Sequence, residues 1–316
     1  MKTIPSAMTR RAFLTQTAAL GAVGLAASRF SAAAGECGGW QIGCYTRPWD
    51  QVEYRVALDA IAEAGYKFCG LMTTKAPRRL VISVDTTLEE ARQIGDECRQ
   101  RGLTPVSVYG GGFPVQKSIE AGIEGLKKLI DNVAAAKAGN LLLGGTNEKL
   151  SDAYYKVVAE CCDYAALKGV GMSVKPHGGN NANGSDCRKI VEKVGHKSFR
   201  IWYDPGNIFF YSNGKLNPVD DAAVVDGMVV GMCVKDYRPA KADPAAPPKK
   251  SPYGGEVMLT PGTGQVNFKA VLARLKKGGF SSGPLIVECL DRSDPAKLTA
   301  EAKKARLFVE EIVRQI

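Results

Sequence analysis

The chain has 316 residues, of which 45% are hydrophobic and 23% charged, and this suits one large α/β domain or two small ones. Only two histidines occur, which excludes a site with several zinc ions on histidine ligands. The net charge of +10 is spread along the chain, and the basic run at residues 247–250 is too short for a nucleic-acid patch. We therefore expect no nucleic-acid partner.

The first residues have the pattern of an export signal. Arg10 and Arg11 form a twin-arginine pair, a mildly apolar run follows over residues 18–27, and residues 32–34 offer an A-x-A cleavage site. The apolar run is too short and too rich in Ala and Gly to span a bilayer, so we expect no stable membrane insertion once the signal is removed. The pattern predicts a twin-arginine signal peptide over residues 1–34 and a periplasmic or other extracytoplasmic location.

The mature domain is then expected to cover residues 37–316. Removing the four positive charges of the signal from the total of +10 leaves +6. Nine cysteines are scattered along the chain without a C-x-x-C pair, and twin-arginine substrates fold in the reducing cytoplasm. We therefore expect ordinary buried thiols rather than a disulfide framework.

A helix, a glycine and an apolar strand recur along the mature sequence. Helices are predicted from i, i+3, i+4, i+7 apolar spacing, and the glycines that follow them are typical of the left-handed residue that ends a helix. We expect helices over residues 54–61, 88–101, 119–139, 153–167, 187–194, 268–275 and 298–316. We expect strands over residues 40–45, 66–72, 105–109, 141–143, 171–175, 200–204, 229–235 and 284–288.

Eight strands alternating with helices over about 280 residues predict a (β/α)8 TIM barrel. A doubly wound open sheet is the alternative, but no G-x-G-x-x-G follows the first strand. The Pro-, Ala- and Lys-rich segment 237–262 follows the seventh strand, and its position predicts a loop over the active-site mouth.

The last four strands end in polar residues, which a closed barrel would bring to one mouth. Asp204 also has a plainer interpretation, because the Pro205-Gly206 that follows it is typical of a turn capped by Asp. The strand-end residues are Lys175 and His177, Asp204 and Asn207, Cys233, Lys235 and Asp236, and Glu288.

Several runs in this half of the chain resemble one protein family. They are KPHGGN from Lys175, YDPGN from Tyr203, CVKD from Cys233, PGTGQVNF from Pro261 and PLIVE ending at Glu288. In this order they resemble the sugar phosphate isomerase/epimerase family, which has the xylose-isomerase-like barrel.

The resemblance implies one divalent cation, Mn²⁺ or Mg²⁺, held by Glu, Asp, His and Glu on strands five to eight. Asp204 and Glu288 match the second and fourth ligands, but Lys175 and Cys233 stand in place of the first Glu and the His. An ammonium group there would neutralise the two carboxylates and could occupy the cation's place. The sequence thus argues against stable metal binding; any metal would use Asp204 and Glu288, with Cys233 or His177 as a further ligand.

The resemblance also implies a function in carbohydrate metabolism: an exported isomerase or epimerase that moves a proton next to the carbonyl of a free or oxidised sugar. In this hypothesis the catalytic residues are Glu288 as general base, Lys175 as electrophile and Asp204. The expected substrate-binding residues are His177, Asn207, Lys235 and Asp236.

Other functions stay open at this stage. A lyase or dehydratase acting on a sugar or an inositol-like compound is a second enzymatic interpretation, and a non-catalytic carbohydrate-binding barrel is the main alternative. An abasic-site endonuclease is disfavoured, because the chain lacks the required histidine cluster and a basic stripe. Whether the chain forms a homo-oligomer is left open.

Overall fold

The computed structural model of this protein describes residues 38–75, 79–240 and 253–316, which belong to the unit Gly35–Ile316. The predicted signal peptide, its cleavage site and Cys37 lie outside the described residues.

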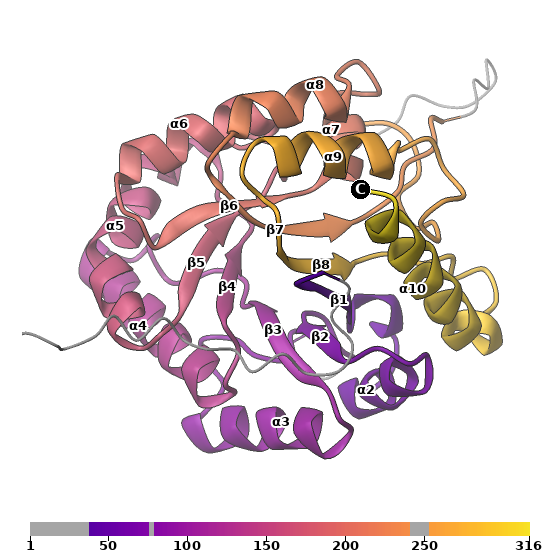
Figure 1. The fold of residues 1–316 in the computed structure, drawn as a ribbon. Coiled ribbons are helices and arrows are strands. Elements are labelled where there is room, and N and C mark those ends of the chain that lie inside the picture. The colour runs from indigo at the N-terminus through magenta and orange to yellow at the C-terminus, as the bar shows by residue number, and fades with distance from the viewer. Residues whose placement is uncertain (1–37, 76–78, 241–252) are drawn as a thin grey trace, which may run out of the picture. The chain divides into compact units, whose positions relative to one another are not determined.

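Eight parallel strands close into a barrel in the order of the chain, with β8 paired to β1 (Figure 1). The prediction of a TIM barrel is confirmed, and the strand boundaries differ from the expected ones by a residue or two. The strands are β1 (Trp40–Tyr45), β2 (Phe68–Leu71), β3 (Thr104–Tyr109), β4 (Asn140–Leu143), β5 (Gly171–Val174), β6 (Phe199–Tyr203), β7 (Val229–Val234) and β8 (Gly283–Val287).

The helices surround the barrel, as Figure 1 shows. The α-helices are α2 (Tyr54–Glu63), α3 (Leu88–Gln100), α4 (Ile119–Ala135), α5 (Ser151–Leu167), α6 (Gly184–Val194), α7 (Pro205–Tyr211), α8 (Pro218–Ala222), α9 (Phe268–Lys277) and α10 (Leu298–Arg314). Short 3-10 helices are η1 (Arg47–Trp49), η2 (Glu148–Leu150), η3 (Ala223–Val225) and η4 (Pro295–Lys297).

Two local expectations were wrong. Pro205-Gly206 does not form a simple turn but begins α7, because proline fits the first turn of a helix, where its missing N–H is not needed. The helix expected to run to Gly139 ends at Ala135, and Lys137, with φ of 58°, adopts the left-handed conformation there.

Apolar side chains fill two layers, one between the sheet and the helices and one inside the barrel. The inner layer needs glycines on neighbouring strands to make room for its largest rings. A Cβ atom on Gly70 would lie 2.1 Å from the Tyr45 ring, and one on Gly231 would lie 2.4 Å from the Trp202 ring. The inner layer comprises Tyr45, Phe68, Met72, Val106, Leu142, Trp202, Cys233 and Ile286, and it forms a solid floor beneath the mouth.

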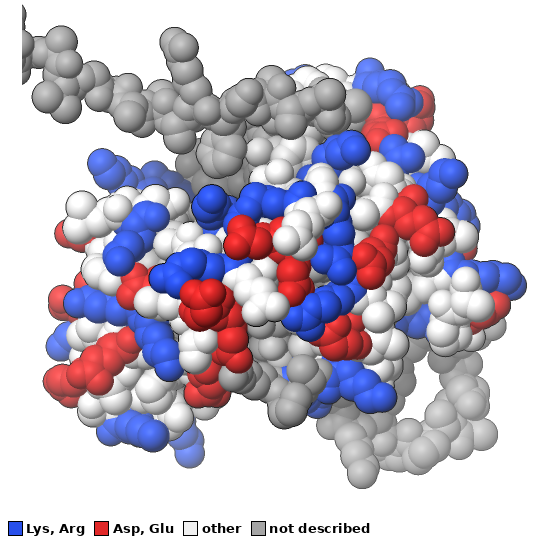
Figure 2. Space-filling model, turned by 90° about the horizontal axis from the view of Figure 1, so that it is seen from below, with Lys and Arg blue, Asp and Glu red and all other residues white. Residues whose placement is uncertain are grey.

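The eight described cysteines are buried and form no disulfide among themselves, which confirms the expected buried thiols for this part of the chain. On the face seen in Figure 2, the described Lys and Arg side chains are interspersed with Asp and Glu. Within the described residues, we find no helix that combines the length and the apolar character needed to cross a bilayer.

Backbone hydrogen bonds hold two parts of the connection from β7 to α9 side by side. Arg238 and Glu256 form an antiparallel bridge, with N···O distances of 2.9 and 2.8 Å between their backbones. Residues 241–252 of the predicted loop lie outside the described residues. Tyr253 packs edge-on against Tyr211, with ring centroids 4.7 Å apart, so the second end of the connection contacts α7.

Candidate active site

The strand pleat aims four charged side chains at the carboxyl end of the barrel. The residue directly after β5, β6, β7 and β8 is Lys175, Asp204, Lys235 and Glu288, respectively. Side chains two residues apart on a strand share a face. The inner layer contains Trp202, Cys233 and Ile286, which lie two positions before Asp204, Lys235 and Glu288. The four side chains therefore lie directly above the floor of the barrel.

The four groups alternate in charge and are almost completely buried. The Lys175 Nζ lies 2.6 Å from Glu288 Oε2 and 3.3 Å from Asp204 Oδ2. The Lys235 Nζ lies 2.7 Å from Glu288 Oε1 and 3.1 Å from Asp204 Oδ2. Each carboxylate thus bridges two ammonium groups, and each ammonium group bridges two carboxylates.

The hydrogen-bond donors of both lysines are largely used within the protein. An ammonium group has three donors. The third donor of Lys235 goes to Asn207 Oδ1 at 3.0 Å, whereas Lys175 has only a weak third contact, to Cys233 Sγ at 4.0 Å. The Asn207 amide in turn donates to Pro176 O at 2.6 Å, so it links the ends of β5 and β7 through their loops.

Asp204 both caps a helix and takes part in the charged cluster, so both interpretations drawn from the sequence apply. Its Oδ1 accepts from the backbone N–H of Asn207 at 3.0 Å and caps α7, while its Oδ2 receives both lysines. The cap fixes the carboxylate, and the fixed carboxylate holds the ammonium groups in place.

The pairing keeps Lys175 and Glu288 ionised. Burial by itself would raise the pKa of Glu288, but Lys175, Lys235 and Arg47 hold that pKa well below its usual range. Burial would likewise lower the pKa of Lys175, but the carboxylates of Glu288 and Asp204 raise it well above its usual value. The Cys233 thiol stays protonated, because burial raises its pKa.

Arg47 is a site residue that the sequence analysis missed. It is the first residue of η1, which is separated from the end of β1 by one residue, and its side chain lines the cavity at the same mouth. Its Nη1 lies 3.4 Å from Glu288 Oε1 and also contacts Cys289 Sγ. The signal was present in the polar residues that follow the first strand, but only the ends of the last four strands were considered.

A cavity of about 290 Å³ opens above the charged cluster. Its walls come from aromatic and aliphatic side chains, and its base comes from the ends of the strands. The lining residues are Arg47, Met72, Thr73, Tyr109, Lys175, His177, Asn207, Phe210, Tyr211, Lys235, Val257 and Glu288. The structure therefore brings five predicted site residues to one cavity and places Asp204 behind the two lysines.

His177 lies at the rim of this cavity between two tyrosines. The centroid of its ring is 6.4 Å from that of Tyr109 and 5.8 Å from that of Tyr211. Partial desolvation, with Lys175 and Lys235 nearby, lowers the pKa of His177 to about 3. His177 is exposed at the rim, and because its pKa is lowered it is a neutral imidazole at pH 7.

Asp236 is placed differently from the other predicted residues. It is adjacent to Lys235, so the pleat turns its side chain away from the mouth, and it does not line the cavity. Its carboxylate accepts four backbone N–H groups, at 2.8 Å from Tyr237, 2.9 Å from Gly262, 2.7 Å from Gly264 and 3.1 Å from Val266. Asp236 therefore organises the loop that leads into α9.

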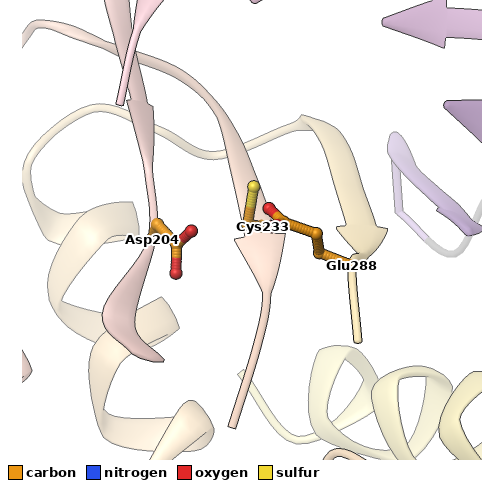
Figure 3. Close-up of side chains that lie close together, drawn as sticks. All are labelled: Asp204, Cys233 and Glu288. Carbon is orange, nitrogen blue, oxygen red and sulfur yellow. The ribbon is translucent and has the colours of Figure 1, made fainter. Parts of the chain in front are cut away.

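The residues that could hold a cation are close together but already paired. Figure 3 shows Asp204, Cys233 and Glu288 pointing toward one another, and one ligand atom from each lies within 4.8 Å of the others. The Lys175 Nζ lies 3.3, 4.0 and 2.6 Å from these same three groups, where a cation would have to bind. His177 is outside this group of ligands. The described donor set does not fit a divalent cation while the ammonium group is present.

Comparison with known families agrees with the barrel. A family model for the xylose isomerase-like TIM barrel matches residues 58–311. The chain belongs to the xylose isomerase-like TIM barrel family. No curated protein matches it.

Several solved structures share this xylose isomerase-like barrel. A xylose isomerase domain protein from Planctomyces limnophilus is 20% identical, with a TM-score of 0.65, over 88% of this chain and 98% of that one. A D-psicose 3-epimerase crystallised with D-fructose is 12% identical, with a TM-score of 0.64, over 86% and 99%. A xylose isomerase-like protein from Mycobacterium smegmatis in complex with magnesium is 15% identical, with a TM-score of 0.65, over 87% and 96%. At these identities the likeness shows the fold alone.

Proposed function

We propose that this protein binds a free or oxidised sugar and moves a proton next to its carbonyl group, with the ammonium of Lys175 acting in place of the divalent cation that the family resemblance implies. The observation that carries this proposal is the position of Lys175 Nζ, 2.6 Å from Glu288 and 3.3 Å from Asp204 at the base of the cavity. The epimerase and magnesium-bound relatives support the class of reaction and the comparison with a metal site.

The proposed reaction begins when a base removes a proton from the carbon next to the carbonyl. The electron pair of the broken C–H bond forms a C=C bond, and the carbonyl oxygen becomes the oxyanion of an enediolate. Lys175 donates a hydrogen bond to that oxygen and stabilises its charge. Return of the proton to the former carbonyl carbon completes an isomerisation, while the adjacent hydroxyl gives its proton to the enediolate oxygen and becomes the new carbonyl. Delivery of a proton from water to the opposite face of the first carbon, with the first proton left on the base, completes an epimerisation.

Glu288 is the proposed base, although its low pKa makes it a weak one in the free protein. A substrate oxygen that accepts a hydrogen bond from Lys175 takes a donor away from Glu288 Oε2. Since an opposite charge within hydrogen-bond distance lowers a carboxylate pKa, weakening that contact raises the pKa and the basicity of Glu288. Substrate binding thus prepares the base.

The rest of the cavity supplies the contacts for the sugar. His177 and Asn207 place polar groups at the wall, and Lys235 lies beside them at the base. Tyr109 and Tyr211 offer aromatic faces against which the C–H groups of a sugar ring can pack. The cavity volume lies at the small end of the range for ligand pockets, which favours a monosaccharide.

A non-catalytic carbohydrate-binding barrel is the second candidate function. It is favoured by one observation: both oxygens of Glu288 already accept from lysines in the free protein. If the substrate does not displace these contacts, the cavity binds a sugar without transferring a proton.

Incubation with sugars in D₂O distinguishes the two functions. The proposed enzyme should incorporate deuterium at the carbon next to the carbonyl, detected by NMR, whichever direction the reaction takes. Glu288→Gln, which keeps the shape of the side chain but not the base, should lower the rate of incorporation by about 100-fold or more. Sugars that bind without any exchange would support the carbohydrate-binding barrel instead.

We also propose that the protein is exported by the twin-arginine route, on the sequence pattern at Arg10 and Arg11. Replacing both residues with Lys should leave the precursor in the cytoplasm, as seen by fractionation and immunoblotting. Delivery of this variant to the periplasm at the level of the parent would contradict the assignment.

A further inference from the structure

The charges around the cavity do not balance. Two lysines and Arg47 contribute three positive charges, whereas Asp204 and Glu288 contribute two negative ones. His177 and Tyr211 add none, because the pKa of His177 is lowered and burial raises the pKa of Tyr211. Burial also raises the pKa of the Cys233 and Cys289 thiols, so both stay neutral. The cavity therefore carries one surplus positive charge.

The surplus charge is available on Arg47. The donors of both lysines already point to partners inside the protein. Arg47 uses Nη1 for Glu288 and Cys289, but no residue in the described part of the chain contacts its Nε or Nη2. Its side chain is 29% exposed and lines the cavity. A guanidinium edge of this kind matches the two oxygens of a carboxylate.

Resting on the proposed function, we propose that the substrate is a sugar acid, and that Arg47 determines specificity by binding its carboxylate. A sugar carboxylate brings the single negative charge that balances the surplus. A phosphate monoester carries between one and a half and two negative charges near pH 7, so it matches a single surplus charge less well. The sugar ring then lies toward Lys175 and His177, and the carboxylate lies toward β1.

Calorimetric titration with matched pairs of ligands tests this assignment. The probes are D-glucuronate against D-glucose, D-galacturonate against D-galactose, and D-gluconate against D-glucitol, with D-glucose 6-phosphate as the phosphate arm. At least one acid should bind about tenfold or more tightly than its uncharged partner, and the preference should decrease as salt is added. Glucose 6-phosphate should bind more weakly than the preferred acid.

Two variants of Arg47 and one control locate the effect. Arg47→Gln should reduce the preference for the acid to about onefold, and Arg47→Lys should keep part of it, because a lysine keeps the charge but not the two-pronged geometry. The control is Arg292→Gln. Arg292 pairs with Asp50 at 2.6 Å, next to η1, but it does not line the cavity, so the preference should be unchanged. Unfolding curves for each variant exclude a loss of folding.

The outcomes separate this inference from the proposed function. Equal binding of acids and uncharged sugars, or a preference that survives Arg47→Gln, overturns the inference. If uncharged sugars then undergo deuterium exchange, the proposed function stands without it. Tighter binding of glucose 6-phosphate than of every acid would replace the carboxylate by a phosphate and also overturn the inference. Failure of every probe to bind counts against both.

Discussion

Glu288→Gln should destabilise the protein by about 3–5 kcal/mol, the cost of removing one partner from a buried ion pair. The substitution keeps the volume of the side chain but leaves Lys175 and Lys235 with Asp204 as their one anionic partner among the described residues. Both lysine side chains are almost completely buried, so water replaces the lost carboxylate poorly. Urea unfolding at pH 7 measures the loss of free energy.

An exposed pair provides the control for this variant. Asp152 and Lys193 lie 2.5 Å apart, and the Asp152 side chain is 92% exposed. Asp152→Asn should therefore leave the free energy of unfolding nearly unchanged. Equal losses for Glu288→Gln and Asp152→Asn would show that the buried charges do not depend on Glu288.

The pH dependence of the parent has a definite sign. Glu288 has a pKa well below its usual value in the folded protein, so the unfolded chain binds more protons in the acid range. Its contribution to stability is fully present above the unfolded pKa of about 4.3 and is lost as the pH falls through the folded value. The difference between the parent and Glu288→Gln should therefore stay constant from neutral pH to about pH 5 and decrease below that.

The second large effect is expected from Lys175→Glu, which should convert the cluster into a metal site. The new carboxylate joins Asp204 and Glu288, and hard cations such as Mn²⁺ prefer oxygen ligands. Excess Mn²⁺ at about 100 times the dissociation constant should stabilise the variant by about 2.7 kcal/mol. For a domain of this size, that corresponds to a rise of about 5 °C in melting temperature. Differential scanning fluorimetry with and without Mn²⁺ measures the shift.

The parent and a double variant serve as comparisons. The parent should show no response to Mn²⁺ or to a chelator and should contain no stoichiometric metal, because the Lys175 ammonium lies among the possible ligands. Lys235 also contacts both carboxylates, so combining Lys175→Glu with Lys235→Met should increase the shift. A parent that carries one tightly held metal ion per chain would contradict the proposal that the ammonium group takes the cation's place.

The barrel was predictable because its signals are local and repeated. Apolar periodicity marks each helix and strand, and the alternation of the two elements leaves few topologies. The start of α7 was missed because Asp-Pro-Gly fits both a turn and a capped helix, and only the capping bond from Asn207 N–H to Asp204 decides between them. The local sequence alone does not determine whether the turn or the capped helix forms, because packing in the folded protein decides between them.

The position of the site was predictable, but the contacts between its side chains were not. Convergence of strand ends placed Lys175, Asp204, Lys235 and Glu288 together, because the fold requires it. Whether Asp236 joins them depends on the phase of the pleat at the end of β7, and a shift of one residue reverses the direction of a side chain. Arg47 was missed since it is distant in sequence from the runs that resemble the family, and only closure of β8 onto β1 brings it to Glu288.

The closed connection between β7 and α9 has a consequence for changing this protein. The backbone bridge of Arg238 with Glu256 holds the two ends of the intervening segment side by side, and the Asp236 carboxylate fixes the turn at Gly262 and Gly264. A segment of different length or sequence can start and end at the same two points, and the entropy of closing a loop increases only slowly with its length. We therefore expect that a different segment can be placed between these two points without altering the barrel or its charged cluster.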